Sequence, residues 1–335
     1  MSEREQFLQT HGWSIISTVG QDSSIRRYFR LRKGEQTAIL METVPDHSPQ
    51  STPGHSIADF VRISKWLNEI GANAPDIYAI DAERGLLILE DFGGICFKYA
   101  VLSGENAHDL YDVAAKTLEH IAAQNCPLDL PQYYDSHVHL RHRRIIDYYL
   151  PLLRGQANEA GLVEAYRSVW AGIEGTLPLC PQTFVHVDYH AENLMYLPKE
   201  GGVKRCGILD FQGAMIGPAP YDLANLLEDA RADIPADIKA AILDAKDENF
   251  RAWYRILATQ FHCRVIGQFI KMAAMDGNDS YLKHIPRLQS YLIEGLKDPL
   301  LVPLAQFFKE NDIVFNKEIP EVLDTLKPLI AADAY

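Results

Sequence analysis

The stretch Phe184–Tyr196, FVHVDYHAENLMY, combines an apolar alternation with three polar groups at fixed spacing. The alternation is typical of a buried strand, and the polar residues gather where that strand ends. Asp188 follows His186 by two residues and precedes Asn193 by five. A buried strand that ends in a carboxylate and an amide indicates a functional site at the end of this strand.

A second apolar segment downstream, Gly207–Phe211, ends in an Asp-Phe pair at Asp210. The order and spacing of the histidine, Asp188, Asn193 and Asp210 match a kinase catalytic loop and its metal-binding aspartate. Phosphoryl transfer needs a carboxylate near the attacking hydroxyl, and oxygen ligands that hold Mg²⁺ on the nucleotide phosphates. Asp188 is the candidate catalytic residue, and Asn193 and Asp210 are the candidate metal ligands.

Each of these polar residues also has a simpler structural interpretation. The two aspartates could only terminate strands, as Asp often does in turns, but the combined pattern disfavours this. For His186, the favoured role is to hold the loop by hydrogen bonding rather than to take part in the chemistry.

Length and composition limit the remaining possibilities. A chain of 335 residues exceeds the usual size of one core, which predicts two lobes. The formal charge of -13 argues against nucleic acid or an anionic membrane as a partner. No apolar run reaches the length of a membrane helix and no leader pattern is recognised at the start, so we expect a cytoplasmic protein. The five cysteines are never spaced as CxxC, and we expect free thiols.

The first ninety residues predict a small antiparallel sheet with one helix, and the rest predicts a larger, mainly helical lobe. We place the boundary at residue 91, with a lobe 1–91 that binds nucleotide and a lobe 92–335 that carries the catalytic and acceptor-binding residues. The fold class is therefore α+β. The expected strands of the first lobe are Ser14–Val19, Arg27–Lys33, Thr37–Val44 and Leu86–Asp91, and its helix is His55–Gly71. In the second lobe the expected helices are Asn106–Asn125, Ser136–Glu159, Leu162–Gly175 and several beyond Tyr221, with strands at Phe184–Val187, Met195–Leu197 and Val203–Phe211.

Four segments together resemble the aminoglycoside phosphotransferase and choline kinase group of kinase-like enzymes. They are Asp22–Leu31, Leu87–Gly93, His186–Met195 and Gly207–Arg231. The resemblance covers nearly the whole chain and implies a two-lobed protein-kinase-like fold that uses ATP and Mg²⁺. The first and last segments are most similar to the subgroup that phosphorylates the anomeric hydroxyl of N-acetylmuramate and N-acetylglucosamine in cell-wall recycling.

The resemblance also implies roles for individual residues. Asp188 becomes the catalytic base, Asn193 and Asp210 the Mg²⁺ ligands, and Asp222 a carboxylate that braces the catalytic loop. Alternatively, Asp222 only favours the start of a helix electrostatically. By the same resemblance, the adenine is expected near the backbone of Leu89–Phe92, and Glu90 and Phe92 are the nucleotide-binding residues predicted there.

Two features depart from the kinase pattern. Leu40 and Met41 stand about where a kinase carries a lysine on its third strand, and no GxGxxG precedes the second strand. No Walker GxxxxGK[ST] motif occurs either, which excludes a P-loop fold. Arg26 and Arg27 are the nearest candidates to replace the lysine, because guanidinium groups fit phosphate, although they could also form a solvated strand edge.

Asp210 and Asp222 are too close in sequence to enclose a long activation loop, so we expect a small-molecule acceptor rather than a protein. An amino sugar is favoured, with an aminoglycoside or a choline-type acceptor as the alternative. A catalytically silent pseudokinase that binds nucleotide is an alternative of another class. The charged run Arg141–Arg144 is expected to be a solvated helix face, or else to meet an anionic group of the substrate.

Overall fold

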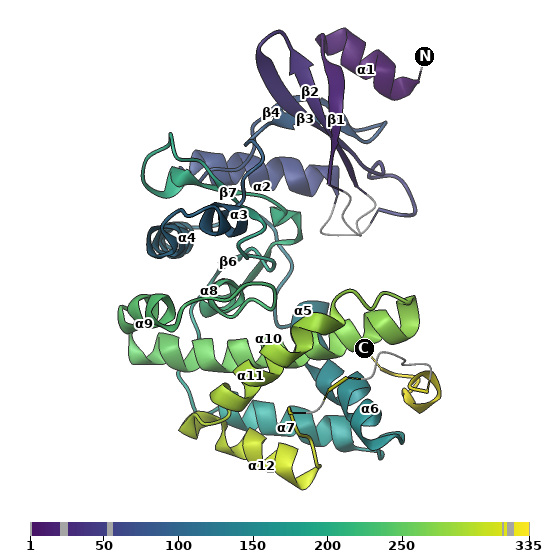
Figure 1. Cartoon of the computed structure of the whole chain (residues 1–335), viewed down its shortest axis with the longest axis vertical. Helices are drawn as coiled ribbons and strands as arrows, with labels where there is room; N and C mark the ends of the chain where they lie inside the picture. The colour runs from purple at the N-terminus through teal and green to yellow at the C-terminus, as the bar shows by residue number, and fades with distance from the viewer. Residues whose placement is uncertain (1, 21–25, 52–55, 317, 320–324, 335) are drawn as a thin grey trace. The chain divides into compact units, whose positions relative to one another are not determined.

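The computed structural model describes residues 2–20, 26–51, 56–316, 318–319 and 325–334 (Figure 1). The chain forms two compact units. The first unit contains residues 1–130 together with His186–Met215, and the second contains Pro131–Val185 together with Ile216–Tyr335. The segment that carries the predicted catalytic loop therefore belongs to the same unit as the N-terminal sheet. The assignment of nucleotide and acceptor binding to residues 1–91 and 92–335 stays a prediction.

The first unit is built on a five-stranded antiparallel sheet in the order β1-β2-β3-β5-β4. Its strands are β1 Ser14–Val19, β2 Arg27–Lys33, β3 Gln36–Glu42, β4 Ile77–Asp81 and β5 Leu86–Glu90. Its helices are α1 Glu3–His11, α2 Ile57–Glu69, α3 Phe97–Leu102 and α4 Ala107–Ala122, and a small ladder pairs β7 Leu194–Tyr196 with β8 Cys206–Ile208. The predicted strands and the predicted helix of this region are confirmed, whereas α1 and β4 were not anticipated.

Apolar alternation explains the core of this sheet. Leu31, Ala38, Leu40 and Ile88 are fully buried and pack with Phe7 from α1. Successive strand residues point to opposite faces, so one apolar set covers one face of the sheet. The buried face of the sheet is thus covered by α1, which begins at a capping box formed by its N-cap serine.

The second unit is mainly helical and is organised around the 29-residue helix α10, Glu248–Asp276. Helix α10 packs against α8 and α11. The other helices are α5 His137–Leu140, α6 Leu150–Arg154, α7 Leu162–Glu174, α8 Pro220–Leu227, α9 Ala236–Asp244, α11 Ile285–Gly295 and α12 Val302–Glu310, and the strands β6 Gln182–Val185 and β9 Met215–Pro218 pair with each other. In the described part of the chain, no helix is long and apolar enough to cross a membrane.

The single helix predicted over Ser136–Glu159 is wrong. The segment instead breaks into α5, a 3₁₀ turn at Arg141–Arg143, a π-helical turn at Ile145–Tyr149 and α6. Pro151 lies just after the π turn and has no N–H to donate back to the preceding turn, so a regular α-helical ladder cannot continue there. The same segment is not a solvated face, because Arg143 and Arg144 are each only 4% exposed.

Candidate active site

The catalytic-loop segment begins where β6 ends and leads into β7, which pairs with β8. Val187 has a φ of 82°, which is a left-handed conformation that strongly disfavours a β-branched residue. This strained residue turns the chain immediately before Asp188, whose side chain is exposed while its neighbours Val187 and Tyr189 are buried. The loop therefore presents the Asp188 carboxylate to solvent from a buried frame.

His186 is buried, with 2% of its surface exposed. Its Nε2 lies 2.8 Å from the carbonyl oxygen of Leu209, so Nε2 carries a proton and donates it to that carbonyl. Burial lowers the pKa of His186, which favours the neutral ring that this contact requires. The hydrogen bond ties the loop to the segment that leads into Asp210, and this is the kind of contact predicted for His186.

Asn193 is oriented by hydrogen bonds on its amide nitrogen. Its Nδ2 donates to the backbone carbonyl of Asp188 at 3.0 Å and lies 3.1 Å from Nε2 of His190. With the nitrogen held in this way, the Oδ1 atom is left to accept a donor or to bind a cation. The backbone N–H of Leu209 donates to the Asn193 carbonyl at 2.9 Å, which continues the β7–β8 ladder toward Asp210.

Asp210 also has a left-handed backbone, with a φ of 61°. Its Oδ1 accepts from Nε2 of Gln212 at 2.6 Å and lies 3.9 Å from Nη1 of Arg26. Burial raises the pKa of Asp210 and the like charge of Asp188 acts in the same direction, against the opposing effects of Gln212, His186 and Arg26. Solvent still reaches 41% of the side chain, so the carboxyl is crowded by protein on one side and open on the other.

These donors fit a hard divalent cation. Asp188 and Asp210 are close enough for their charges to interact, and the oriented Asn193 amide supplies a third oxygen. Mg²⁺ prefers one or two carboxylates and completes its shell with water and phosphate oxygens. Throughout the described ranges, no cluster of three or more His, Cys, Asp or Glu side chains could hold a metal by itself. A cation held by two carboxylates and an amide would need further oxygen ligands from water or a bound group.

The two candidate arginines lie in different surroundings. Arg26 is buried and directs its guanidinium toward Asp210. Arg27 begins β2, is 60% exposed, and pairs at 2.9 Å with Glu42, its cross-strand partner on β3. Leu40 and Met41, which stand about where a kinase lysine would fall, are buried in the sheet. The structure therefore brings Arg26, and not a residue of β3, to the predicted metal site.

The model of the phosphotransferase enzyme family matches residues 15–258. The chain belongs to this phosphotransferase family. It is 32% identical to an N-acetylmuramate/N-acetylglucosamine kinase of Caulobacter vibrioides, over 92% of this chain and 96% of that protein. It is 28% identical to a kinase of the same description from Pseudomonas putida, over 88% of each chain.

The fold agrees with that of solved kinases. An amicoumacin kinase in complex with AMP-PNP and Ca²⁺ superimposes with a TM-score of 0.59 at 13% identity, covering 90% of this chain and 95% of the other. The predicted α+β, protein-kinase-like fold is thus confirmed. As a member of the phosphotransferase family, the protein is a small-molecule kinase.

Two contacts of this phosphotransferase were not found from the sequence. Arg30 on β2 forms a bidentate pair with Asp91, at 2.8 and 3.1 Å, just after β5. Lys98 on α3 pairs at 2.6 Å with Glu192 of the catalytic loop. Both are opposite charges far apart in sequence, and only the pairing of the elements brings them together.

The segment Leu89–Phe92, where the adenine is expected, is anchored at both predicted residues. The backbone N–H of Asp76 donates to Oε2 of Glu90 at 3.2 Å, and burial raises the pKa of Glu90. The ring of Phe92 packs onto Gly207 of β8, where an added Cβ would lie 2.8 Å from it. The segment is therefore tied both to the sheet and to the strand that leads into Asp210.

The remaining predicted residue, Asp222, is buried in the first turn of α8 in the second unit. Its role as a brace of the loop stays a prediction.

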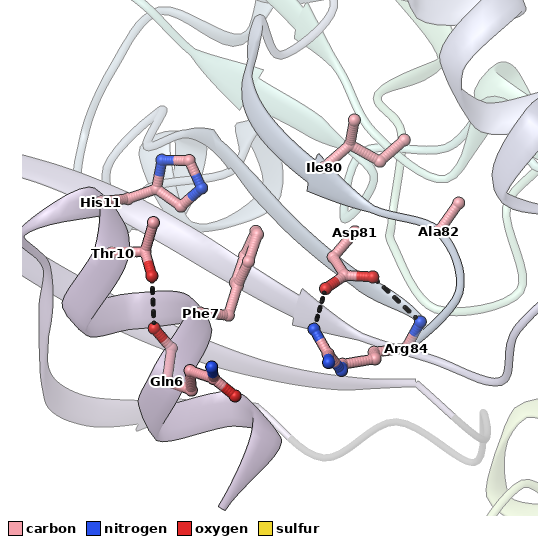
Figure 2. Close-up of a pocket in the computed structure, with 8 residues that line it drawn as sticks. All are labelled: Gln6, Phe7, Thr10, His11, Ile80, Asp81, Ala82 and Arg84. Atoms are coloured by element: carbon pink, nitrogen blue, oxygen red, sulfur yellow. Dashed lines mark hydrogen bonds and ion pairs between the residues drawn. The ribbon is translucent and has the colours of Figure 1, made fainter.

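The depression shown in Figure 2 lies between α1 and β4 and contains none of the predicted site residues. Its charged groups, Asp81 and Arg84, pair with each other at 2.8 Å. This surface is therefore not the candidate active site. The depression is lined by Gln6, Phe7, Thr10, His11, Ile80, Asp81, Ala82 and Arg84.

Proposed function

We propose that this phosphotransferase uses ATP and Mg²⁺ to phosphorylate an N-acetylated amino sugar at its anomeric hydroxyl. The observation that carries the proposal is the convergence of Asp188, Asn193 and Asp210 on one loop system. The acceptor is supported by the relatives, which are described as N-acetylmuramate/N-acetylglucosamine kinases. Because ATP is the donor, we propose a cytoplasmic location.

In this proposal each residue has one task. Asp188 accepts a hydrogen bond from the acceptor hydroxyl, orients it toward the γ-phosphorus, and takes its proton as the new O–P bond forms and the bond to ADP breaks. Asn193 and Asp210 would hold Mg²⁺, which neutralises the phosphate charge. Arg26, placed beside Asp210, is the cation best situated to contact the phosphates in place of the missing lysine.

The experiment is incubation with ATP, Mg²⁺ and a panel of acceptors, followed by phosphorus NMR of the product. A phosphate coupled to the anomeric proton of N-acetylmuramate or N-acetylglucosamine supports the proposal. Transfer only to an aminoglycoside or to choline would preserve the kinase assignment and overturn the acceptor.

The same panel also tests the alternative that the absent lysine and glycines suggest from the sequence, a pseudokinase that binds nucleotide without turnover. Tight ATP binding, measured by calorimetry, with no product from any acceptor would favour the pseudokinase over the amino-sugar kinase.

A further inference from the structure

Gln212 lies two residues after the candidate metal ligand Asp210 and is buried, with 4% of its surface exposed. Its Nε2 donates to Oδ1 of Asp210 at 2.6 Å, a short, charge-assisted hydrogen bond. A buried amide needs a partner, which is the simplest explanation of this bond. The acceptor, however, is a carboxylate that stays open to solvent on its other side. The bond therefore also fixes how that carboxylate faces the solvent.

The turn that carries Gln212 is held by packing. Residues Phe211–Gly213 form one 3₁₀ turn, and the N–H of Ala214 donates back to the Phe211 carbonyl at 3.0 Å. The ring of Phe211 is fully buried, and its centre lies 4.8 Å from that of Phe60 on α2. Because the backbone is fixed and the Gln212 side chain is buried, its amide has little freedom to follow a carboxylate that rotates. Gln212 therefore sets the rotation of the Asp210 carboxylate.

The protein contacts of this carboxylate are on one of its two oxygens. Gln212 donates to Oδ1, and Nη1 of Arg26 lies 3.9 Å from the same atom. Among the described residues, none donates a hydrogen bond to Oδ2 of Asp210. The carboxylate therefore presents one oxygen to a cation. The candidate ligand Asn193 does the same, because its amide nitrogen is held by the backbone carbonyl of Asp188.

Ligands that present one oxygen distinguish between divalent cations. Mg²⁺ is small, demands near-octahedral geometry and uses one or two carboxylates, whereas Ca²⁺ takes about six to eight oxygens and accepts both oxygens of one carboxylate. We propose that Gln212 is a positioning residue that holds Asp210 in its one-oxygen orientation and thereby sets a preference for Mg²⁺ over Ca²⁺. Without the Gln212 donor, the carboxylate is free to turn both oxygens toward the larger cation.

This role of Gln212 rests on the proposed function, because the cation is the one that the proposed reaction uses. It adds to that function a residue that does not itself bind the metal. The role can be tested without any acceptor sugar. The test therefore does not depend on which hydroxyl is phosphorylated.

The test is displacement of bound Mn²⁺ by Mg²⁺ and by Ca²⁺, followed by electron paramagnetic resonance with AMP-PNP bound to the protein. Gln212→Met keeps nearly the same length and removes the donor. Gln212→Glu keeps the shape and places a further carboxylate beside Asp210. Gln260→Met is the matched control, because Gln260 of the second unit is also buried and donates to Oε1 of Glu174 at 2.6 Å.

We expect Gln212→Met to weaken Mg²⁺ binding roughly 10- to 100-fold, as for loss of a group that orients a metal ligand. Ca²⁺ binding should weaken less, so the ratio of the Mg²⁺ affinity to the Ca²⁺ affinity falls. Gln212→Glu should bind Ca²⁺ more tightly than the wild type does, because Ca²⁺ affinity depends on the number of charged ligands. The control should keep the wild-type ratio.

Several outcomes would overturn this role. An unchanged affinity ratio in Gln212→Met would leave Gln212 only satisfying its own amide, and the proposed function would stand. Equal weakening of both cations would show that Gln212 supports Asp210 without selecting the metal. If Gln212→Met does not fold, Gln212→Glu decides, and a Ca²⁺ affinity no higher than that of the wild type refutes the role. A wild type that binds AMP-PNP but no Mn²⁺ would overturn the proposed metal site itself.

Discussion

Gly267 is the position at which the smallest change should have a large and calculable effect on stability. Replacing glycine by alanine inside a helix normally stabilises it by about 0.5–1 kcal/mol, because the unfolded chain loses freedom. At Gly267 the new Cβ would lie 2.3 Å from the Arg144 carbonyl oxygen, about 1 Å closer than the 3.4 Å at which ordinary contact begins. The obstructing atoms are backbone, so relief requires α10 and the π turn to move apart.

Overpacking of this kind costs roughly 1–3 kcal/mol, occasionally more. We therefore expect Gly267→Ala to lower the melting temperature by roughly 2–12 °C, at ~2–4 °C per kcal/mol for a domain of 150–250 residues. Gly172 on α7 is the matched control, because it is also inside a helix of the second unit and an added Cβ meets no atom within 4 Å. Gly172→Ala should raise the melting temperature by a few degrees. Differential scanning calorimetry measures both, and a Gly267→Ala protein as stable as Gly172→Ala would refute the close approach of Arg144.

Three further predictions concern the catalytic loop and the buried histidines. Asp188→Asn should keep ATP and sugar binding by calorimetry but lower kcat, because the amide is nearly isosteric and cannot accept the proton; unchanged kcat would remove Asp188 from the chemistry. Arg26→Ala should raise the KM for ATP more than Arg27→Ala does, because Arg26 faces Asp210 whereas Arg27 is held by Glu42; equal effects would contradict this. Burial lowers the pKa of His139 and of His262 to about 4, so both stay neutral in the folded protein while the unfolded chain takes up protons below about pH 6.5. Their contribution to the free energy of unfolding is therefore present above about pH 6.5 and declines toward pH 4; a melting temperature that rises between pH 7 and pH 5 would contradict it.

Much of the first unit could be predicted because its strands are short, alternating and bounded by turn residues. The segments β1, β2, β3 and β5 have this pattern, and so does the apolar face of α2. Helix α1 lacked the signal, since only Phe7 and Leu8 of its nine residues are buried. Strand β4 could not be recognised because it lies at the edge of the sheet. Its large apolar residues Tyr78 and Ile80 are exposed, so the usual pattern of buried apolar and exposed polar positions is reversed.

The proximity of Asp188, Asn193 and Asp210 could be predicted from their spacing. A tight loop and a two-stranded ladder leave little freedom in how residues at these positions are placed. The sequence did not indicate which of Arg26 and Arg27 faces Asp210. Successive residues of an extended chain point to opposite sides, so a shift of one residue in the register exchanges which arginine faces the site. That register is set by the pairing of Arg27 with Glu42 across the sheet, and nothing near Arg26 in the sequence specifies it.

The run Arg141–Arg144 shows why local charge is a weak guide to exposure. Four basic residues in a row predict a solvated face when only the helix itself is considered, because isolated charges are expensive to bury. The burial of Arg143 depends on Asp147, which is close enough in sequence to have been recognised as its partner. The backbone of Arg144 lies against Gly267, more than a hundred residues away, where the missing side chain lets the two backbones approach closely. Gly267, a glycine inside a helix, was therefore the only sequence feature that could indicate this contact. The sequence does not show that its neighbour is Arg144, because only the fold brings the two together.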